Sequence, residues 1–159
     1  MKKIVNPWAD EPTYHCFGCD PNNASGLKME FFEDGDDIVS HWHPRIEFES
    51  WRNTLHGGVQ AALIDEIASW VVFRKFQTSG VTSNMEVQYK KPVALNQSHI
   101  TLRARVVRQR RQVIDIEVEL FNAEGELCSK GLCIYFLMPK DRARDVFGFM
   151  EFKTEDEVE

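Results

Sequence analysis

A helical pattern of apolar residues between His56 and Gln77 constrains the fold of this chain most strongly. One apolar face at helical spacing is formed by Val59, Ala62, Leu63, Ile67, Trp70 and Val71. The other faces also carry apolar residues, namely Ala61, Ile64, Ala68, Val72 and Phe73. A helix that is apolar on most sides is surrounded by protein. We therefore expect a buried helix that Ser79-Gly80 ends.

Strand patterns flank this helix on both sides. Before it, residues 27–33 and 38–43 lie on either side of Asp34-Gly35-Asp36, which is typical of a hairpin. After it, alternating residues predict strands over 81–89, 99–107, 113–121 and 127–138. This order predicts an α+β domain in which an antiparallel sheet curls around one long central helix.

Charges on two of these strands are complementary. Arg103 and Arg105 face outward from one strand, and Asp115, Glu117 and Glu119 face outward from the next. Antiparallel pairing would bring the opposite charges together. The simpler interpretation is a pair of solvated faces, because exposed ion pairs contribute little.

Composition limits the classes of function. With 43% hydrophobic and 28% charged residues, the 159-residue chain has an ordinary globular balance that suits one domain. The net charge of −6 argues against a nucleic-acid partner. No segment is apolar and long enough to span a bilayer, and residues 1–7 lack the apolar centre of a signal peptide, so we expect a cytoplasmic protein without a membrane partner.

The chain divides into three expected parts. Residues 1–26 contain Pro7, Pro12 and Pro21 and predict an irregular segment packed on the domain. Residues 27–138 form the single domain, and residues 139–159 form a C-terminal extension. The acidic end of that extension, residues 153–159, is expected to fray.

The four cysteines leave two interpretations open. Cys16-x-x-Cys19 resembles half of a zinc site or a redox pair, and His15 lies beside it. No second Cys-x-x-Cys follows, and Cys128 and Cys133 lie within a predicted strand. We favour a buried turn with free thiols and expect no metal.

The helix start at His56-Gly57-Gly58 is a candidate chemical site. A helix N-terminus presents unpaired backbone N–H groups and a partial positive charge. Two glycines there let a substrate oxygen approach the backbone closely. Gly57 and Gly58 therefore indicate a site that polarises a carbonyl group. The alternative is a tight helix entry packed under a strand.

Asp65 strengthens the chemical interpretation. It lies too far along the helix to act as a cap, and a carboxylate on a buried helix is costly unless it is used or satisfied. Glu66 points about 100° away, so only one of the two carboxylates faces this site. Gly57 and Asp65 are separated by about 12 Å along one helix. If both act on one carbonyl, two copies of the chain must supply them, and a two-fold dimer would hold two such sites.

Residues 55–66, LHGGVQAALIDE, resemble the helix motif of hotdog-fold acyl-CoA thioesterases of the phenylacetate-pathway and thioesterase-superfamily-member type. Residues 48–54 are similar to the loop that precedes this motif, and residues 81–92 are similar to the strand that follows it. Cys16-Phe17-Gly18-Cys19 and Ser25-Gly26-Leu27 resemble the entry segment of many members. The resemblance covers about residues 14–138 and implies a hotdog fold.

The resemblance also implies catalytic roles. The backbone N–H of Gly57 would polarise a thioester carbonyl, and Asp65 of the partner subunit would act as general base or nucleophile. Thr82 matches a position that holds the attacking water, and His56 matches the motif histidine, which shapes the helix entry or contacts the acyl carbonyl. Ser50 departs from the amide or glycine found in relatives, and Asn53 is a nearby substitute. The remaining substrate-binding candidates are Gly58, Glu66, Ser83, Lys90 and Lys91.

The implied substrate is an acyl-CoA or a related acyl thioester, hydrolysed without a cofactor. Consistently, the sequence has no G-x-S-x-G nucleophile motif. The phosphates of coenzyme A could meet basic residues at a subunit edge, although solubility also explains these: Lys90, Lys91, Arg108, Arg110 and Arg111. We expect a homodimer that pairs further into a dimer of dimers, that is, a homotetramer.

Other functions remain open at this level. A hotdog dehydratase would act on 3-hydroxyacyl thioesters, but its histidine-containing loop is not evident. A non-catalytic acyl-CoA-binding module and a structural protein without a ligand are further alternatives, because a fold does not prove catalysis. The sequence does not name the acyl group. Aromatic residues that could line its pocket, or belong to the core, are Phe31, Phe32, Trp42, Phe48, Trp51, Trp70 and Phe73.

Overall fold

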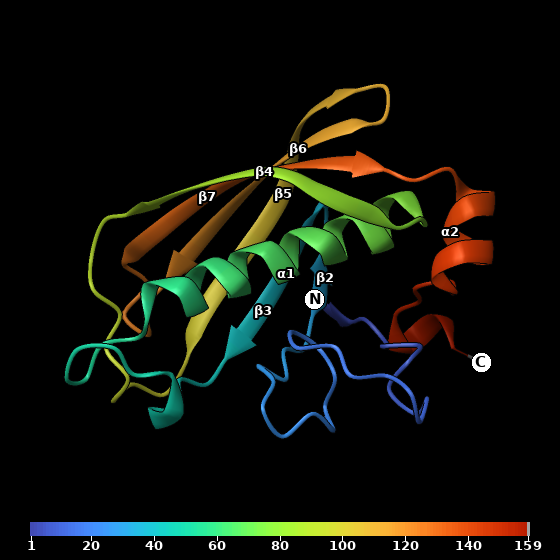
Figure 1. Cartoon of the computed structure of the whole chain (residues 1–159). Helices are drawn as coiled ribbons and strands as arrows, with labels where there is room; N and C mark the ends of the chain where they lie inside the picture. The colour runs from blue at the N-terminus through green and yellow to red at the C-terminus, as the bar shows by residue number, and fades with distance from the viewer. Residues whose placement is uncertain (159) are drawn as a thin grey trace.

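An antiparallel sheet of seven strands curls around one long helix, α1, in the computed structural model, which describes residues 1–158 (Figure 1). The strands are β1 (Lys2–Lys3), β2 (Phe32–Asp34), β3 (Asp37–Trp42), β4 (Gly80–Tyr89), β5 (Ile100–Arg110), β6 (Val113–Phe121) and β7 (Leu127–Leu137). Their order across the sheet is β1-β2-β3-β5-β6-β7-β4. The helices are α1 (Gly57–Phe76) and α2 (Lys140–Phe147), with short 3-10 turns at Ile46–Phe48 and Glu155–Glu157. The predicted α+β architecture is confirmed.

Helix α1 follows its sequence pattern closely. His56 is its N-cap, and Gln77 ends it in the left-handed conformation at φ 49°, two residues before the expected stop at Ser79-Gly80. Leu63, Ile64 and Ile67 are fully buried against the sheet. The approach is so close that a Cβ at Gly131 of β7 would lie 2.5 Å from Cγ2 of Ile64. Burial of α1 on the sheet forms the core, as its all-round apolar pattern predicts.

The predicted hairpin is present, but its first strand is shorter than expected. Residues 27–31 are not a strand, although Leu27, Met29 and Phe31 are buried. Their backbone groups bond instead to the N-terminal segment, where the Leu27 N–H donates to the Phe17 carbonyl at 2.7 Å and the Met29 N–H donates to the Gly18 carbonyl at 2.9 Å. The alternating pattern of residues 27–31 therefore reflects which side chains are buried, and not a strand. The irregular N-terminal segment supplies the backbone hydrogen bonds that a neighbouring strand would otherwise supply.

The expected pairing of opposite charges occurs between β5 and β6. Arg105 lies opposite Glu117 in the register, and its guanidinium is 2.8 Å from the Glu119 carboxylate. Arg103 lies opposite Glu119 but binds Asp34 and Asp37 at 2.9 and 2.8 Å, across the neighbouring hairpin. These pairs fix side chains on a partly exposed face, where each contributes little to stability.

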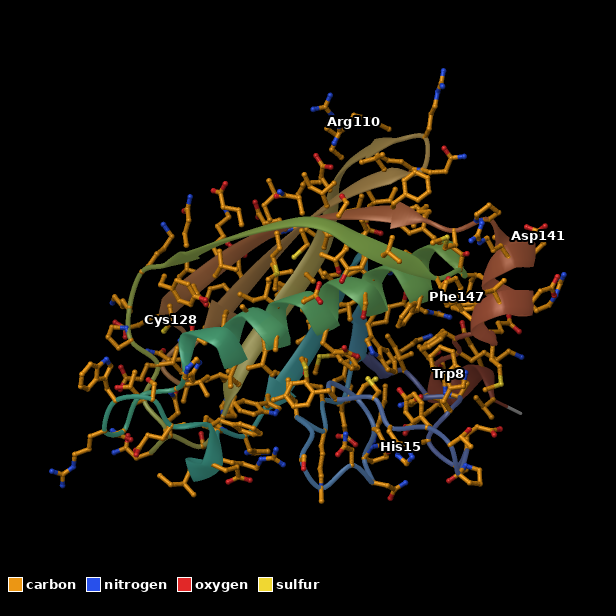
Figure 2. The ribbon with its side chains drawn as sticks, viewed as in Figure 1. Trp8, His15, Arg110, Cys128, Asp141 and Phe147 are labelled. Atoms are coloured by element: carbon orange, nitrogen blue, oxygen red, sulfur yellow. The ribbon has the colours of Figure 1, made fainter. Side chains whose placement is uncertain are left out.

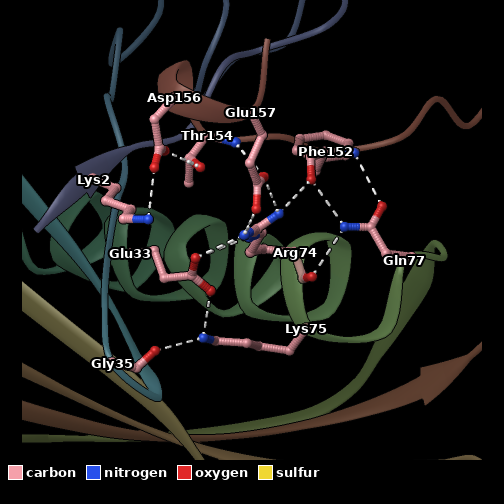
Figure 3. Close-up of polar contacts among 10 residues, drawn as sticks. All are labelled: Lys2, Glu33, Gly35, Arg74, Lys75, Gln77, Phe152, Thr154, Asp156 and Glu157. Carbon is pink, nitrogen blue, oxygen red and sulfur yellow. Dashed lines mark hydrogen bonds and ion pairs between the residues drawn. The ribbon is translucent and has the colours of Figure 1, made fainter. Parts of the chain in front are cut away.

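The C-terminal residues from Phe152 to Glu157 are docked, so the expectation that residues 153–159 fray is wrong for them, and Glu159 lies outside the described residues. Phe152 and Thr154 are fully buried. Figure 3 shows the anchor, Arg74 in the last turn of α1, which donates to the Phe152 carbonyl at 2.9 Å and to the Glu157 carboxylate. A capping box at Thr154 and Glu157 orders the final turn. Fraying was predicted from the acidic composition alone. The burial of Phe152 and the ion pair between Arg74 and Glu157 stabilise the docked segment despite its negative charge.

This anchor predicts a response to acid. Burial raises the pKa of Glu33, but hydrogen bonds from Arg74 and Lys75 outweigh it and hold that pKa below 4.5. The hydrogen bond from Arg74 lowers the pKa of Glu157 to about 2. Both carboxylates therefore stabilise the docked state above about pH 4.5, and this stabilisation is lost as the pH falls toward about 2. We expect the protection of the Phe152 and Thr154 amides against hydrogen exchange, relative to the intrinsic exchange rate at each pH, to fall over that range in the wild type and to lose most of this pH dependence in Arg74→Gln. Equal pH dependence in both proteins would contradict the assignment.

Membrane crossing by a helix is not supported. Among residues 1–158, no helix combines the length and the apolar character that a bilayer span requires.

Candidate active site

Asp65 lies in the middle of α1 and is partly buried. Its Oδ1 accepts a hydrogen bond from the Thr82 hydroxyl at 2.8 Å and another from the Tyr135 hydroxyl at 2.7 Å. Among residues 1–158, no hydrogen bond reaches Oδ2 of Asp65. The carboxylate is therefore held by one oxygen, and the other is left to act on a ligand.

The two hydroxyls come from neighbouring strands that pair directly. Thr82 of β4 lies opposite Tyr135 of β7 in the register, and a bulge between Thr82 and Asn84 follows at once. Such a bulge re-aims side chains and is common beside active sites. Tyr135 is buried, and burial together with the nearby Asp65 charge raises the pKa of its phenol, so it remains a hydrogen-bond donor.

The start of α1 holds a second set of polar groups. Nδ1 of His56 accepts a hydrogen bond from the Gly58 N–H at 2.9 Å, so His56 caps the helix and occupies the Gly58 donor. The Tyr89 hydroxyl donates to the Gly57 carbonyl at 2.7 Å. The Gly57 amide is a first-turn donor that finds no acceptor within residues 1–158. It remains free to polarise a ligand oxygen.

Both groups lie against one edge of the sheet. Strand β4 is an edge strand of ten residues, and Thr82 and Tyr89 are near its two ends. Thr82 and Tyr89 lie opposite Tyr135 and Ser129 of β7, which are six residues or about 20 Å apart along the strand. Within one chain, the Asp65 carboxylate and the Gly57 amide thus lie too far apart to contact one small group.

Several of the predicted substrate-binding residues make hydrogen bonds within the chain. Ser50 and Asn53 are exposed in the loop before α1, where Ser50 donates to the Thr54 carbonyl and Asn53 pairs with Asn96 at 3.0 Å. Ser83 lies within the β4 bulge and donates to the Ile134 carbonyl at 3.1 Å. The Glu66 carboxylate accepts from the Trp70 indole at 3.1 Å and lies near Cys16, apart from the Asp65 partners.

The basic residues fall into two groups at opposite ends of the sheet. Lys90 and Lys91 follow β4, and both of their amides donate to the Cys128 carbonyl. Arg110 lies at the tip of the β5–β6 hairpin and pairs with Asp115 at 2.6 Å. Figure 2 shows Arg110 and Cys128 far apart. One chain therefore cannot bring both groups to one phosphate.

An aromatic cavity of about 220 Å³ lies beside the start of β4 and α2. Figure 2 shows two of its lining residues, Trp8 and Phe147, near each other from opposite ends of the chain. The other lining residues are Phe73, Ser79, Gly80, Val81 and Phe149. Of the aromatic residues that the sequence left open as pocket or core, Phe31, Trp42 and Trp70 are core, and Trp51 is 84% exposed.

Tyr135 and Tyr89 are the polar residues of this region that sequence reasoning missed. Tyr135 alternates with Cys133 and Leu137 on the inner face of β7 and therefore reads as core. Its hydroxyl meets Asp65 only because β7 pairs with β4 under α1. The sequence feature that could have identified Tyr135 is a tyrosine at an inward-facing position opposite Thr82. It can be recognised only when the register between β4 and β7 is known.

Comparisons with known proteins agree with this architecture. Residues 52–129 match the family model described as thioesterase superfamily. A protein of Sulfurisphaera tokodaii named "Putative esterase" is 31% identical over 113 residues, which cover 71% of this chain and 83% of that protein. The chain belongs to the thioesterase superfamily, and its fold is the predicted hotdog fold.

Solved structures support the fold independently. A thioesterase superfamily protein superposes with a TM-score of 0.70 at 20% identity, over 77% of this chain and 60% of that one. A thioesterase protein of Streptococcus pneumoniae, solved with coenzyme A, gives a TM-score of 0.65 at 23% identity over 70% and 90% of the two chains. A Streptococcus mutans protein bound to acetyl-CoA gives 0.65 at 18% identity, with the same shares.

Proposed function

We propose that this protein hydrolyses an acyl-CoA, or a related acyl thioester, to a free acid and a thiol. The observation that carries the proposal is the Asp65 carboxylate, which Thr82 and Tyr135 hold by Oδ1 alone. A fixed carboxylate with one oxygen left over suits a general base or a nucleophile.

The site is completed by a second copy of the chain. Strand β4 is long, mostly exposed and at the sheet edge, where unpaired backbone groups favour pairing with another strand. In an antiparallel β4–β4 pair, a two-fold axis at Glu86 places Thr82 of one copy opposite Tyr89 of the partner subunit, because the bulge at Ser83 adds one residue to the strand. Thr82 is hydrogen-bonded to Asp65, and Tyr89 is hydrogen-bonded to Gly57. This pairing therefore brings Asp65 of one copy close to Gly57 of the partner subunit, at one shared site. Two equivalent sites result.

The chemistry follows from these two groups. The Gly57 N–H donates to the thioester carbonyl oxygen and stabilises the charge that develops on it. Asp65 of the partner subunit removes a proton from an attacking water, or attacks the carbonyl carbon itself through Oδ2 and is then released by water. Either route breaks the C–S bond and expels the thiol. A thioester carbonyl has weak resonance stabilisation, so this small apparatus suffices without a serine nucleophile.

Similar proteins support the substrate class. The Streptococcus pneumoniae and Streptococcus mutans structures contain coenzyme A and acetyl-CoA, respectively. The aromatic cavity beside β4 is smaller than a typical drug-sized pocket, and we propose that it takes a short acyl or aryl group. In a dimer, the two basic groups at opposite ends of β4 come from different chains and can approach the coenzyme A phosphates together.

We further propose that two dimers associate through the outer face of the sheet. Leu132 and Phe136 lie on the outward positions of β7 and are 40% and 45% exposed. Exposed apolar residues of this size on a regular sheet face favour association. The mass in solution, by light scattering, distinguishes a tetramer from a dimer.

A panel assay tests the function directly. The protein is incubated with straight-chain and aromatic acyl-CoAs while free thiol is measured, and with a 3-hydroxyacyl-CoA while enoyl absorbance is followed. Thiol release that depends on the enzyme supports the proposal. Enoyl formation without thiol release would indicate a dehydratase, and binding by calorimetry without either product would indicate a binding module.

Tyr135 is a positioning residue, and its removal should have a graded effect. In Tyr135→Phe, Asp65 loses one of its two Oδ1 hydrogen bonds and gains freedom to rotate. We expect kcat to fall roughly 10-fold or more, since misplacement of a reacting group is costly, while KM changes little. The Thr82→Ser variant retains its hydroxyl and serves as the control with near wild-type kcat. A Tyr135→Phe enzyme with unchanged kcat would show that the phenol does not orient Asp65.

A further inference from the structure

The Cys16-x-x-Cys19 turn lies on the face of α1 that carries Glu66. The two Sγ atoms are 2.9 Å apart, and the Cys19 N–H donates to Sγ of Cys16 at 3.3 Å. Sγ of Cys16 is 3.6 Å from the Glu66 carboxylate. The two sulfurs and the carboxylate all lie within 4.8 Å of one another. The proposed thioesterase site uses none of these three groups.

The two thiols differ in exposure and in ionisation. Cys16 is partly exposed, whereas Cys19 is buried at 5% exposure. A hydrogen bond from the Cys19 thiol lowers the pKa of Cys16, and that same bond, with burial, raises the pKa of Cys19. The reachable sulfur is thus the one that ionises more readily to a thiolate, which is the form that attacks a disulfide. The Tyr14 hydroxyl, 2.8 Å from Sγ of Cys19, holds the buried thiol in place.

Glu66 is enclosed beneath the turn. A Cβ at Gly18 would lie 2.3 Å from its carboxyl carbon, so only glycine allows this approach. Burial raises the pKa of Glu66 to about 7, and the Trp70 indole donates to its Oε1. A carboxyl group with that pKa can accept and release a proton near neutral pH.

We propose that Cys16 and Cys19 form a redox-active dithiol that undergoes exchange with low-molecular-weight disulfides, and that Glu66 accepts the proton of the Cys19 thiol. Sγ of Cys16 attacks one sulfur of the external disulfide, so a mixed disulfide forms and one thiolate leaves. The Cys19 proton then passes to Glu66, and Sγ of Cys19 attacks Sγ of Cys16. The second thiolate leaves, the external disulfide has been reduced to two thiols, and Cys16 and Cys19 have lost two electrons.

The geometry favours this chemistry over a metal site. Two thiolates on one tetrahedral zinc ion, each at 2.3 Å, lie about 3.8 Å apart. The observed 2.9 Å is shorter than that separation and approaches the roughly 2.05 Å of a disulfide. Each sulfur also has a hydrogen-bond partner within the cluster, which suits a reduced dithiol.

Oxidation of the full-length protein by oxidised glutathione tests the proposal. After alkylation of the remaining thiols, mass spectrometry should find a Cys16–Cys19 disulfide in the wild type and in the matched control Cys128→Ser, which alters a distant buried cysteine. Cys19→Ser should stop at a persistent glutathione adduct on Cys16. Glu66→Gln should form that adduct and resolve it roughly 100-fold more slowly than the wild type.

Two results would overturn the proposal. One is a wild-type adduct on Cys16 as long-lived as that of Cys19→Ser, because the buried thiol then does not resolve it. The other is a purified protein that holds one zinc ion per chain by elemental analysis and reacts with glutathione disulfide only after chelation. These readouts are independent of thioester hydrolysis, so they stand whether or not the proposed function is correct.

Discussion

Asp65→Asn should lower the turnover of acyl-CoA by roughly 10²–10⁴-fold, the range typical of a lost general base. The amide is nearly isosteric with the carboxylate and can still accept hydrogen bonds from Thr82 and Tyr135 through its oxygen, so the fold around residue 65 is kept. It can neither remove a proton from water nor attack a carbonyl carbon. The measurement is steady-state thiol release with the best substrate of the acyl-CoA panel.

The mass of Asp65→Asn in solution and its affinity for coenzyme A, measured by calorimetry, provide the controls. Both should match the wild type, because neither the β4 edge nor the helix start changes. Turnover within about twofold of the wild type would remove Asp65 from the mechanism. The protein would then still belong to the thioesterase superfamily, but the acting group would have to be sought elsewhere.

Gly57→Pro should lower kcat by roughly 10²–10³-fold, the usual effect of removing one donor to a developing oxyanion. Proline lacks the backbone N–H but is well suited to the first position of a helix. The preceding residue, His56, already has φ −57° and ψ 132°, which is a conformation that precedes proline readily. The substitution therefore deletes the proposed donor while α1 keeps its start.

Gly57→Ala is the matched variant for this experiment. A Cβ at position 57 would lie 3.5 Å from the Tyr89 ring, which is ordinary contact, and the N–H is retained. We expect its kcat to stay within about tenfold of the wild type, since only crowding changes. Equal losses of kcat in the proline and alanine variants would indicate that crowding by a side chain at position 57 causes the loss and that the amide of residue 57 is not a donor.

Local patterns were sufficient to predict the main elements of the fold. The all-round apolar segment between residues 56 and 77 predicts the buried helix, and strict alternation predicts β5 and β6 almost to their ends. The two-residue strand β1 is too short to carry a pattern. The docked C-terminus was missed because its stability comes from Arg74, which is about 80 residues away from Glu157 in the sequence.

The candidate site was predictable only in part. Gly57, Asp65 and Thr82 belong to motifs that can be read along the chain. Tyr135 and Tyr89 are polar only at their tips and depend on strand register to reach Asp65 and Gly57, so their residue types indicate core or surface equally well. The placement of Glu66 beneath Gly18 depends on the path of an irregular segment that has no periodicity to read.

A mixing experiment tests the shared site most directly. We expect the Asp65→Asn and Gly57→Pro chains each to be nearly inactive in the proposed homodimer, and they are mixed in equal amounts under conditions of subunit exchange. If one chain supplies Gly57 and the other Asp65, every mixed dimer has one intact site, and activity should return to about a quarter of the wild-type value. If both groups acted within one chain, no mixed dimer would hold an intact site, and a mixture as inactive as its components would contradict the account.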